Sequence, residues 1–178
     1  LEVSNANKTI TLASGANLQV TTSQGTSTAT ADLTGALATA SLNVLNIAIN
    51  DNSPTTNTIT FTDQVITNFK TVNVSLSDNL TTATSFNIGS TNNLVVTGSK
   101  ALTLAGSTTA ASVDASGMTG VVTANLAGTT TVGTISTGSG ADAITVAAAR
   151  TSGNYSISTG AGNDTINMIA AGAVIDGG

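Results

Sequence analysis

Two stretches near the C-terminal end of the sequence repeat the same arrangement of glycine and aspartate. ISTGSGADAI occupies residues 135–144, and ISTGAGNDTI occupies residues 157–166, twenty-two residues later. Each copy keeps two glycines and one aspartate at the same spacing: Gly138, Gly140 and Asp142, then Gly160, Gly162 and Asp164. Carboxylates and turn carbonyls are hard oxygen ligands, so the chemistry that these residues could do is the binding of a hard cation.

Calcium suits this arrangement better than other ions. Glycine lets the backbone turn with its carbonyls facing inward, and Ca²⁺ takes six to eight oxygen ligands. If Asp142 and Asp164 stack at the ~4.8 Å spacing of neighbouring strands, their repulsion is about 1 kcal/mol in water and ~3–4 kcal/mol at an effective dielectric of 20. Because Ca²⁺ turns this repulsion into attraction, we expect metal binding and folding to be coupled.

A third copy of the frame begins where the sequence stops. Asp176 is followed by Gly177 and Gly178, and Gly178 lies eighteen residues after Gly160. The predicted calcium site therefore consists of eight residues: Gly138, Gly140, Asp142, Gly160, Gly162, Asp164, Asp176 and Gly178. Asp114 is a weaker candidate because only one glycine, Gly117, accompanies it.

The alternative is that these are ordinary turns in which Asp caps backbone amides. A single G-x-G-x-D would favour that interpretation, whereas two copies in register, in a chain of pI about 4.1, favour calcium. Neither copy is followed by the G-K-[ST] of a phosphate-binding loop, and neither has the third glycine of a dinucleotide fingerprint.

Composition excludes several classes of function. The chain has no Cys and no His, which removes disulfides, thiol and imidazole catalysis and the usual zinc ligands. Four basic residues and four aromatic ones cannot build a nucleic-acid groove, so nucleic acid is not an expected partner. The longest nearly apolar run, residues 168–175, is too short to span a bilayer, and the first ten residues lack the features of a signal peptide. Disorder fits poorly with 40% hydrophobic residues and a net charge of −5.

Short runs in which apolar and small polar residues alternate predict β-strands. Gly, Asn, Asp and Ser separate the runs, and Pro54 is the only proline. The predicted strands lie within residues 8–14, 17–23, 57–63, 70–78, 85–90, 93–99 and 100–107. The chain is therefore predicted to be all-β.

The spacing of the glycines fits either a hairpin sandwich or a solenoid. The solenoid is favoured by five isoleucines that recur at intervals of nine, thirteen, nine and nine residues: Ile135, Ile144, Ile157, Ile166 and Ile175. This is a nine-residue unit with one four-residue insertion around residues 150–155. We therefore predict a parallel β-solenoid, a β-roll-like stack of short strands with Gly and Asp turns.

The N-terminal third is less regular. Residues 31–50 carry both helical and strand signals, and we expect a strand over 41–50 and a loop or short helical turn over 29–38. The polar stretch 50–57 is the predicted boundary between a poorly repetitive β segment (1–56) and the solenoid (57–178). Because the final residues stop within a turn, the chain is interpreted as a segment of a longer protein.

At the paired turns the sequence resembles the RTX proteins, bacterial proteins with calcium-binding nonapeptide repeats. It lacks the first glycine of that nonapeptide, since Thr137 and Thr159 stand there. Residues 60–178 further resemble the RTX-type S-layer proteins: VITNFKTVNVSLSD at 65–78 is similar to a recurrent strand of theirs, with Lys70 where Glu is usual, and VDASG at 113–117 to a common turn.

This resemblance implies a secreted structural protein of the bacterial cell surface, exported by type I secretion. It implies a self-assembling S-layer lattice of copies of the chain, with Ca²⁺ as the cofactor and no enzymatic activity. Cell-surface polysaccharide or lipopolysaccharide is the candidate anchoring ligand. No membrane insertion is expected.

Three other functions share features with this sequence. The first is the calcium-binding β-roll or stalk of a large secreted RTX adhesin or enzyme. A β-helical polysaccharide lyase is disfavoured because Arg150 lacks a partner lysine near the acidic pair. An ice-binding surface is disfavoured because Thr does not recur as T-x-T at one fixed period.

Overall fold

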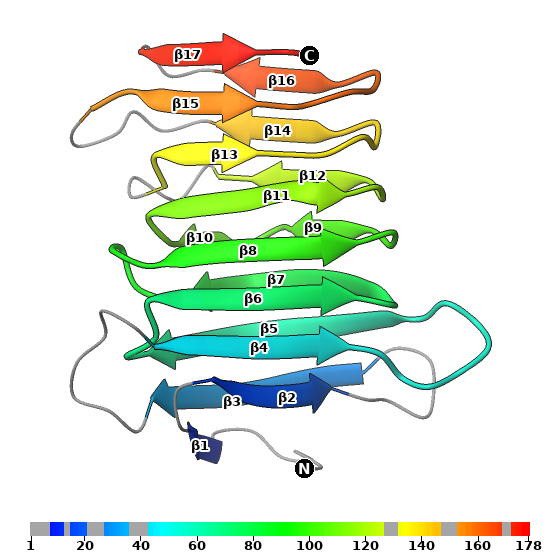
Figure 1. Cartoon of the computed structure of the whole chain (residues 1–178), viewed down its shortest axis with the longest axis vertical. Helices are drawn as coiled ribbons and strands as arrows, with labels where there is room; N and C mark the ends of the chain where they lie inside the picture. The colour runs from blue at the N-terminus through cyan, green and yellow to red at the C-terminus, as the bar shows by residue number, and fades with distance from the viewer. Residues whose placement is uncertain are drawn as a thin grey trace.

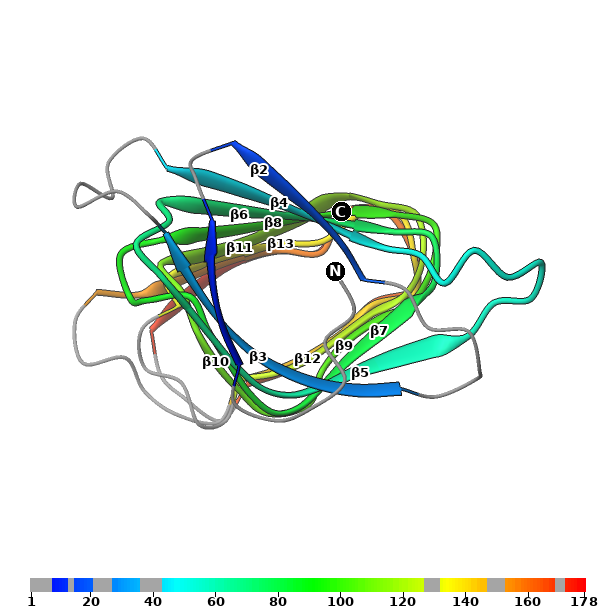
Figure 2. The ribbon, with the colours of Figure 1, turned by 90° about the horizontal axis from the view of Figure 1, so that it is seen from below.

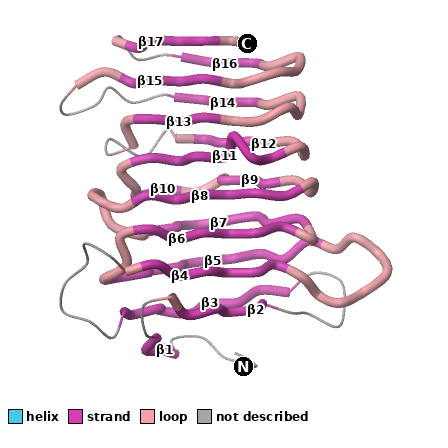
Figure 3. Tube along the Cα trace, viewed as in Figure 1, coloured by secondary structure: helices cyan, strands magenta, loops and turns pink. Residues whose placement is uncertain are grey.

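The computed structural model describes residues 8–12, 15–20, 27–35, 43–126, 132–146, 153–168 and 172–178. Within these ranges the chain is all-β and has no helix (Figures 1 and 3). The strands form two sheets in which all pairing is parallel, and the chain passes between them as it climbs the stack. This confirms the prediction of a parallel β-solenoid.

The chain builds both sheets coil by coil, in chain order. Sheet A contains β1 (Lys8–Leu12), β3 (Ser27–Gly35), β5 (Thr58–Thr67), β7 (Asn79–Asn87), β9 (Leu102–Leu104), β12 (Val122–Asn125), β14 (Ala143–Val146) and β16 (Thr165–Met168), with β10 (Ser107–Thr109) paired to β7. Sheet B contains β2 (Ala16–Val20), β4 (Val44–Ile49), β6 (Thr71–Leu76), β8 (Asn93–Gly98), β11 (Ser112–Met118), β13 (Thr134–Ser136), β15 (Tyr155–Ser158) and β17 (Ala173–Asp176). Viewed along the stack, the two sheets face each other (Figure 2).

The core lies between the sheets and is mainly aliphatic, although all four aromatic side chains of the chain are buried in it. Alternation along each strand sends every second side chain inward, as in β4, where Leu45, Ile47 and Ile49 are buried. The parallel register then stacks buried residues in columns, such as Leu45 on Val72 and Val72 on Leu94. The low aromatic content therefore does not prevent a continuous core.

The isoleucine repeat corresponds to the passage between the sheets. Ile135, Ile157 and Ile175 pair in sheet B, while Ile144 and Ile166 pair in sheet A. The nine-residue interval is thus half a coil, taking the chain from one sheet to the other.

One local prediction is wrong. Residues 29–35, expected as a loop or helical turn, lie in β3, because β1 and β5 pair with it on either side. Tertiary pairing here overrides the helical spacing of the local sequence. Residues 36–38 lie outside the described ranges, and the strand expected over 41–50 is confirmed as β4.

Residues 50–57 connect β4 to β5 in a loop that projects from the stack (Figure 1). The sheets contain strands from both sides of this loop. The division of the chain into two segments at this place stays a prediction.

Candidate metal centre

The two repeated turns occupy equivalent positions in successive coils. Residues 137–142 lead from β13 to β14, and residues 159–164 lead from β15 to β16. Because β13 pairs with β15 and β14 with β16, the two turns lie directly one above the other. The parallel register of four short strands therefore positions the site.

The glycines of these turns stand where no side chain would fit. A Cβ built on Gly138 would lie 1.8 Å from the carbonyl oxygen of Met118, and one on Gly160 would lie 2.1 Å from that of Gly138. Gly160 also has φ of +71°, a conformation that favours glycine. Glycine at these positions lets the backbones of neighbouring coils approach closely.

A second column of glycines runs beside the first. A Cβ on Gly140 would lie 2.6 Å from the carbonyl oxygen of Gly120, and one on Gly162 would lie 2.1 Å from that of Gly140. Gly120 falls outside the repeated G-x-G-x-D motif, because the residue two positions after it is Val122 rather than Asp. Its only signal in the sequence is that TGVV at 119–122 occupies, one coil earlier, the place of SGAD at 139–142.

The two aspartates form a ladder along the stack. Oδ1 of Asp142 accepts a hydrogen bond from the backbone N–H of Val122 (2.7 Å), and Oδ1 of Asp164 accepts one from the N–H of Asp142 (2.8 Å). Asp142 is 1% exposed. The carboxylates therefore point into the stack and hold each coil to the preceding one.

The second oxygen of each carboxylate has no partner. Oδ2 of Asp142 and Oδ2 of Asp164 are both buried and accept no hydrogen bond. Burying a carboxylate oxygen without a donor is costly, and such a group usually has an ion or a water as its partner. Two unpartnered carboxylate oxygens in adjacent coils are a donor set that fits a hard divalent cation.

Threonine replaces the first glycine of the frame and has a role of its own. Thr137 and Thr159 are buried, and the Thr137 hydroxyl donates to the carbonyl oxygen of Thr159 (2.9 Å). The hydroxyl of Thr159 has no partner. In the sequence these threonines stand out only as departures from the first glycine of the nonapeptide, and no sequence pattern predicts the contact between them.

Asp164 is also reached from the surface. A cavity of about 580 Å³ lies along the second turn and is lined by Thr159, Gly162, Asn163, Asp164, Thr165, Ile166 and Gly177. Asp164 itself is half-buried. The cavity therefore reaches Asp164, while the unpartnered Oδ2 of this residue is buried.

The predicted third copy is only partly in place. Gly178 stacks on Gly160, since a Cβ built on it would lie 1.5 Å from the Gly160 carbonyl oxygen. Asp176, in contrast, lies in β17 opposite Ser158, is exposed, and accepts from the N–H of Gly178 (3.2 Å). The structure therefore brings together Asp142, Asp164 and the glycines but does not bring Asp176 to the ladder.

Asp114 does not join the ladder either. It is exposed in β11, and its Oδ1 accepts from both the N–H (3.0 Å) and the hydroxyl (2.6 Å) of Ser116. These contacts close a local turn, which gives Asp114 a structural role.

A second pair of buried aspartates, which the sequence analysis did not predict, holds the loop between β4 and β5. The Asp78 carboxylate accepts from the N–H of Asp51 (2.8 Å) and the N–H of Asn57 (3.0 Å), one at each end of the loop. Asp51 accepts from the N–H of Ser53 (2.8 Å) and from the Asn57 side-chain amide. All four carboxylate oxygens have donors, so this pair is satisfied within the protein.

The remaining described residues offer no comparable centre. Nowhere in the described residues, the two repeated turns included, is there a group of three or more His, Cys, Asp or Glu side chains placed to hold a metal ion, so Asp142 and Asp164 would need backbone oxygens as further ligands. Nor do the described residues form any helix long and apolar enough to cross a membrane.

Comparisons with protein-family models, with curated proteins and with solved structures gave no match to this chain.

Proposed function

We propose that this chain is a structural segment of a secreted bacterial surface protein of the RTX-type S-layer kind, and that Ca²⁺ stabilises its β-solenoid. The metal is held at the turns 137–142 and 159–164, by the carboxylates of Asp142 and Asp164 together with oxygens of the glycine turns. Copies of the chain associate laterally into a lattice at the cell surface. The role is mechanical support, not catalysis.

One observation carries the calcium proposal. Asp142 and Asp164 lie in adjacent coils, and each keeps one buried carboxylate oxygen without a donor. Ca²⁺ supplies positive charge between them, and its binding energy adds to the stability of the folded coils.

The lattice proposal rests on composition and architecture. A regular stack of parallel strands with a charged fraction of only 7% suits an extended scaffold. The second candidate is a calcium-binding roll or stalk in a larger secreted RTX adhesin or enzyme. It shares the metal centre but needs no lateral association.

The calcium test is thermal unfolding, followed by far-UV circular dichroism, with excess chelator and with millimolar Ca²⁺. At a Ca²⁺ concentration of 100 Kd, binding adds about 2.7 kcal/mol, which corresponds to a rise of roughly 5–10 °C in Tm for a chain of this size. Asp142→Asn keeps an oxygen for the Val122 N–H but removes the charge. This substitution should abolish the calcium-dependent rise in Tm without lowering the Tm measured in chelator.

Asp114→Asn is the matched control, because Asp114 is an exposed carboxylate of the same solenoid. Asp114→Asn should keep the full calcium-dependent rise in Tm. Superimposed native curves with and without Ca²⁺ would show that Asp142 and Asp164 are only turn caps. Electron microscopy of the protein with Ca²⁺ then separates the two candidates, since ordered sheets support the S-layer segment and isolated rods support the stalk.

A further inference from the structure

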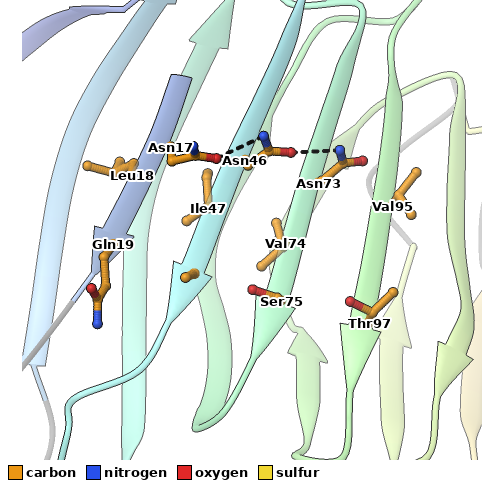
Figure 4. Close-up of a pocket in the computed structure, with 11 residues that line it drawn as sticks. Asn17, Leu18, Gln19, Asn46, Ile47, Asn73, Val74, Ser75, Val95 and Thr97 are labelled. Carbon is orange, nitrogen blue, oxygen red and sulfur yellow. Dashed lines mark hydrogen bonds between the residues drawn. The ribbon is translucent and has the colours of Figure 1, made fainter. Parts of the chain in front are cut away.

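The outer face of sheet B carries an open trough (Figure 4). Its strands lie at the N-terminal end of the stack, away from the turns at 137–142 and 159–164 (Figure 1). Its volume is about 630 Å³, within the range of ligand-binding clefts. It crosses β2, β4, β6 and β8, and β2 lies at an angle to the strands stacked on it (Figure 2). Ala48 and Ser75, both small, lie along it.

A row of side-chain amides crosses the trough. Asn17, Asn46 and Asn73 stand opposite one another in three consecutive strands. The Asn46 amide donates to Oδ1 of Asn17 (3.0 Å), and the Asn73 amide donates to Oδ1 of Asn46 (2.8 Å), as Figure 4 shows. Each amide is oriented by its neighbours, so little side-chain freedom remains to be lost on binding.

The row keeps hydrogen-bonding capacity for a ligand. A side-chain amide has two N–H donors and an oxygen with two acceptor sites, and the contacts within the row use one donor and one acceptor site of Asn46. Asn46 therefore retains a donor beside an acceptor. A sugar hydroxyl both donates and accepts, so this pair matches it in both directions.

The rest of the lining indicates the charge and character of the ligand. None of the eleven lining residues is charged, although the chain has a net charge of −5. Val95 continues the row after Asn73 and ends the amide ladder with an apolar surface. Hydroxyl partners next to small apolar surfaces fit a polyol with exposed C–H groups, whereas an ionic ligand would find no counter-charge.

We propose that this trough binds a neutral hexose chain laid along the stack, across β2, β4, β6 and β8. Successive hydroxyls meet the amides of successive coils, which repeat at the ~4.8 Å spacing of paired strands. The site is independent of the calcium proposal, because no residue of the metal centre lines the trough.

The test uses the full chain in Ca²⁺ and three neutral probes: cellohexaose, mannohexaose and maltohexaose. Binding is measured by isothermal titration calorimetry and by backbone amide NMR. At least one probe should bind, with shifts confined to the four strands of the trough and with an affinity that salt does not change. Hexagalacturonate, an acidic hexasaccharide, should not bind.

Asn46→Ala should weaken binding about tenfold, the effect of one or two lost hydrogen bonds. Ser75→Val fills the trough with a residue that suits a strand, so it should abolish binding while keeping the fold. Asn167→Ala, an exposed asparagine on β16 of the other sheet, is the matched control and should bind like the native chain.

Failure of all three neutral probes overturns the proposal, and so does an equal loss in Asn46→Ala and Asn167→Ala. A second copy of the chain in the trough also overturns it, and this would appear as dimerisation that Ser75→Val abolishes. Asp142→Asn separates the two proposals, because it should lose the response to calcium and keep sugar binding.

Discussion

Buried carboxylates appear in two different states in this chain. Asp51 and Asp78 have a donor for every oxygen, whereas Asp142 and Asp164 each have one oxygen bonded and one unpartnered. Since burial without a partner is costly, the first pair is complete as a structural element. The second pair lacks a partner for one oxygen of each carboxylate, and for this reason we propose the cation there.

The first of these pairs predicts a response to acid. The hydrogen bond from the Asn57 amide, followed by those from Ser53 and the neighbouring backbone, lowers the pKa of Asp51 below its ordinary value of 3.8. A lowered folded-state pKa contributes stability above the unfolded value, and this contribution is lost as pH falls through the folded value. Unfolding in chelator from pH 7 downward should therefore show a loss of stability below about pH 4.

Asp51→Asn should show a shallower loss over the same range, because its side chain no longer takes up a proton. An unchanged slope in Asp51→Asn would mean that this carboxylate contributes nothing to acid unfolding.

At the scale of strands and turns, the elements could be predicted from the sequence more readily than the register in which the strands pair. The alternation of residues predicted ranges that overlap β1, β2 and β5 to β9, and the repeated G-x-G-x-D predicted both turns of the candidate metal centre. Stacked partners are 18 residues apart between Ile157 and Ile175 but 29 apart between Ala16 and Leu45. Because coil length varies so much, no fixed period reveals which residues share a column.

Two columns of stacked polar side chains can be identified only from the strand register. Thr60, Thr81, Thr103 and Thr123 stack in sheet A at offsets of 21, 22 and 20 residues, although Thr has no fixed period in the sequence. The asparagines of the trough are likewise 29 and 27 residues apart. β3 escaped prediction for a related reason, since its helical spacing is overridden by partners on both sides.

The close stacking of the turns gives a prediction at this scale. In Gly138→Ala the new Cβ meets the backbone carbonyl of Met118, which cannot rotate away as a side chain would. Forcing the two coils apart should destabilise the protein by about 3 kcal/mol, the upper end of typical overpacking costs. Gly177→Ala is the control, because nothing lies within 4 Å of its added Cβ. Urea unfolding of both variants measures the difference, and similar midpoints would mean that the turns separate easily.

At the scale of the whole molecule, each coil rests on its neighbours, and strand pairs join only adjacent coils within a sheet. Stability in such a stack is approximately a sum of terms for each coil and each interface. Distant parts of the chain should therefore behave independently.

A chain that ends at residue 126 tests this independence. It keeps β1 to β12 and loses both turns of the metal centre. It should retain the β-sheet circular dichroism signal per residue, while its Tm should no longer respond to Ca²⁺. Complete unfolding of the shortened chain would show that the stack is a single cooperative unit, and a retained calcium response would place the metal elsewhere.

The two described ends of the chain lie at opposite ends of the stack (Figure 1). A pull applied between them acts across the strands, so every interface between coils carries the same load and the weakest interface separates first. Each coil of about 20 residues releases roughly 70 Å of chain. Under tension the molecule would lengthen in steps and dissipate energy at each one, as an extensible link rather than a rigid rod.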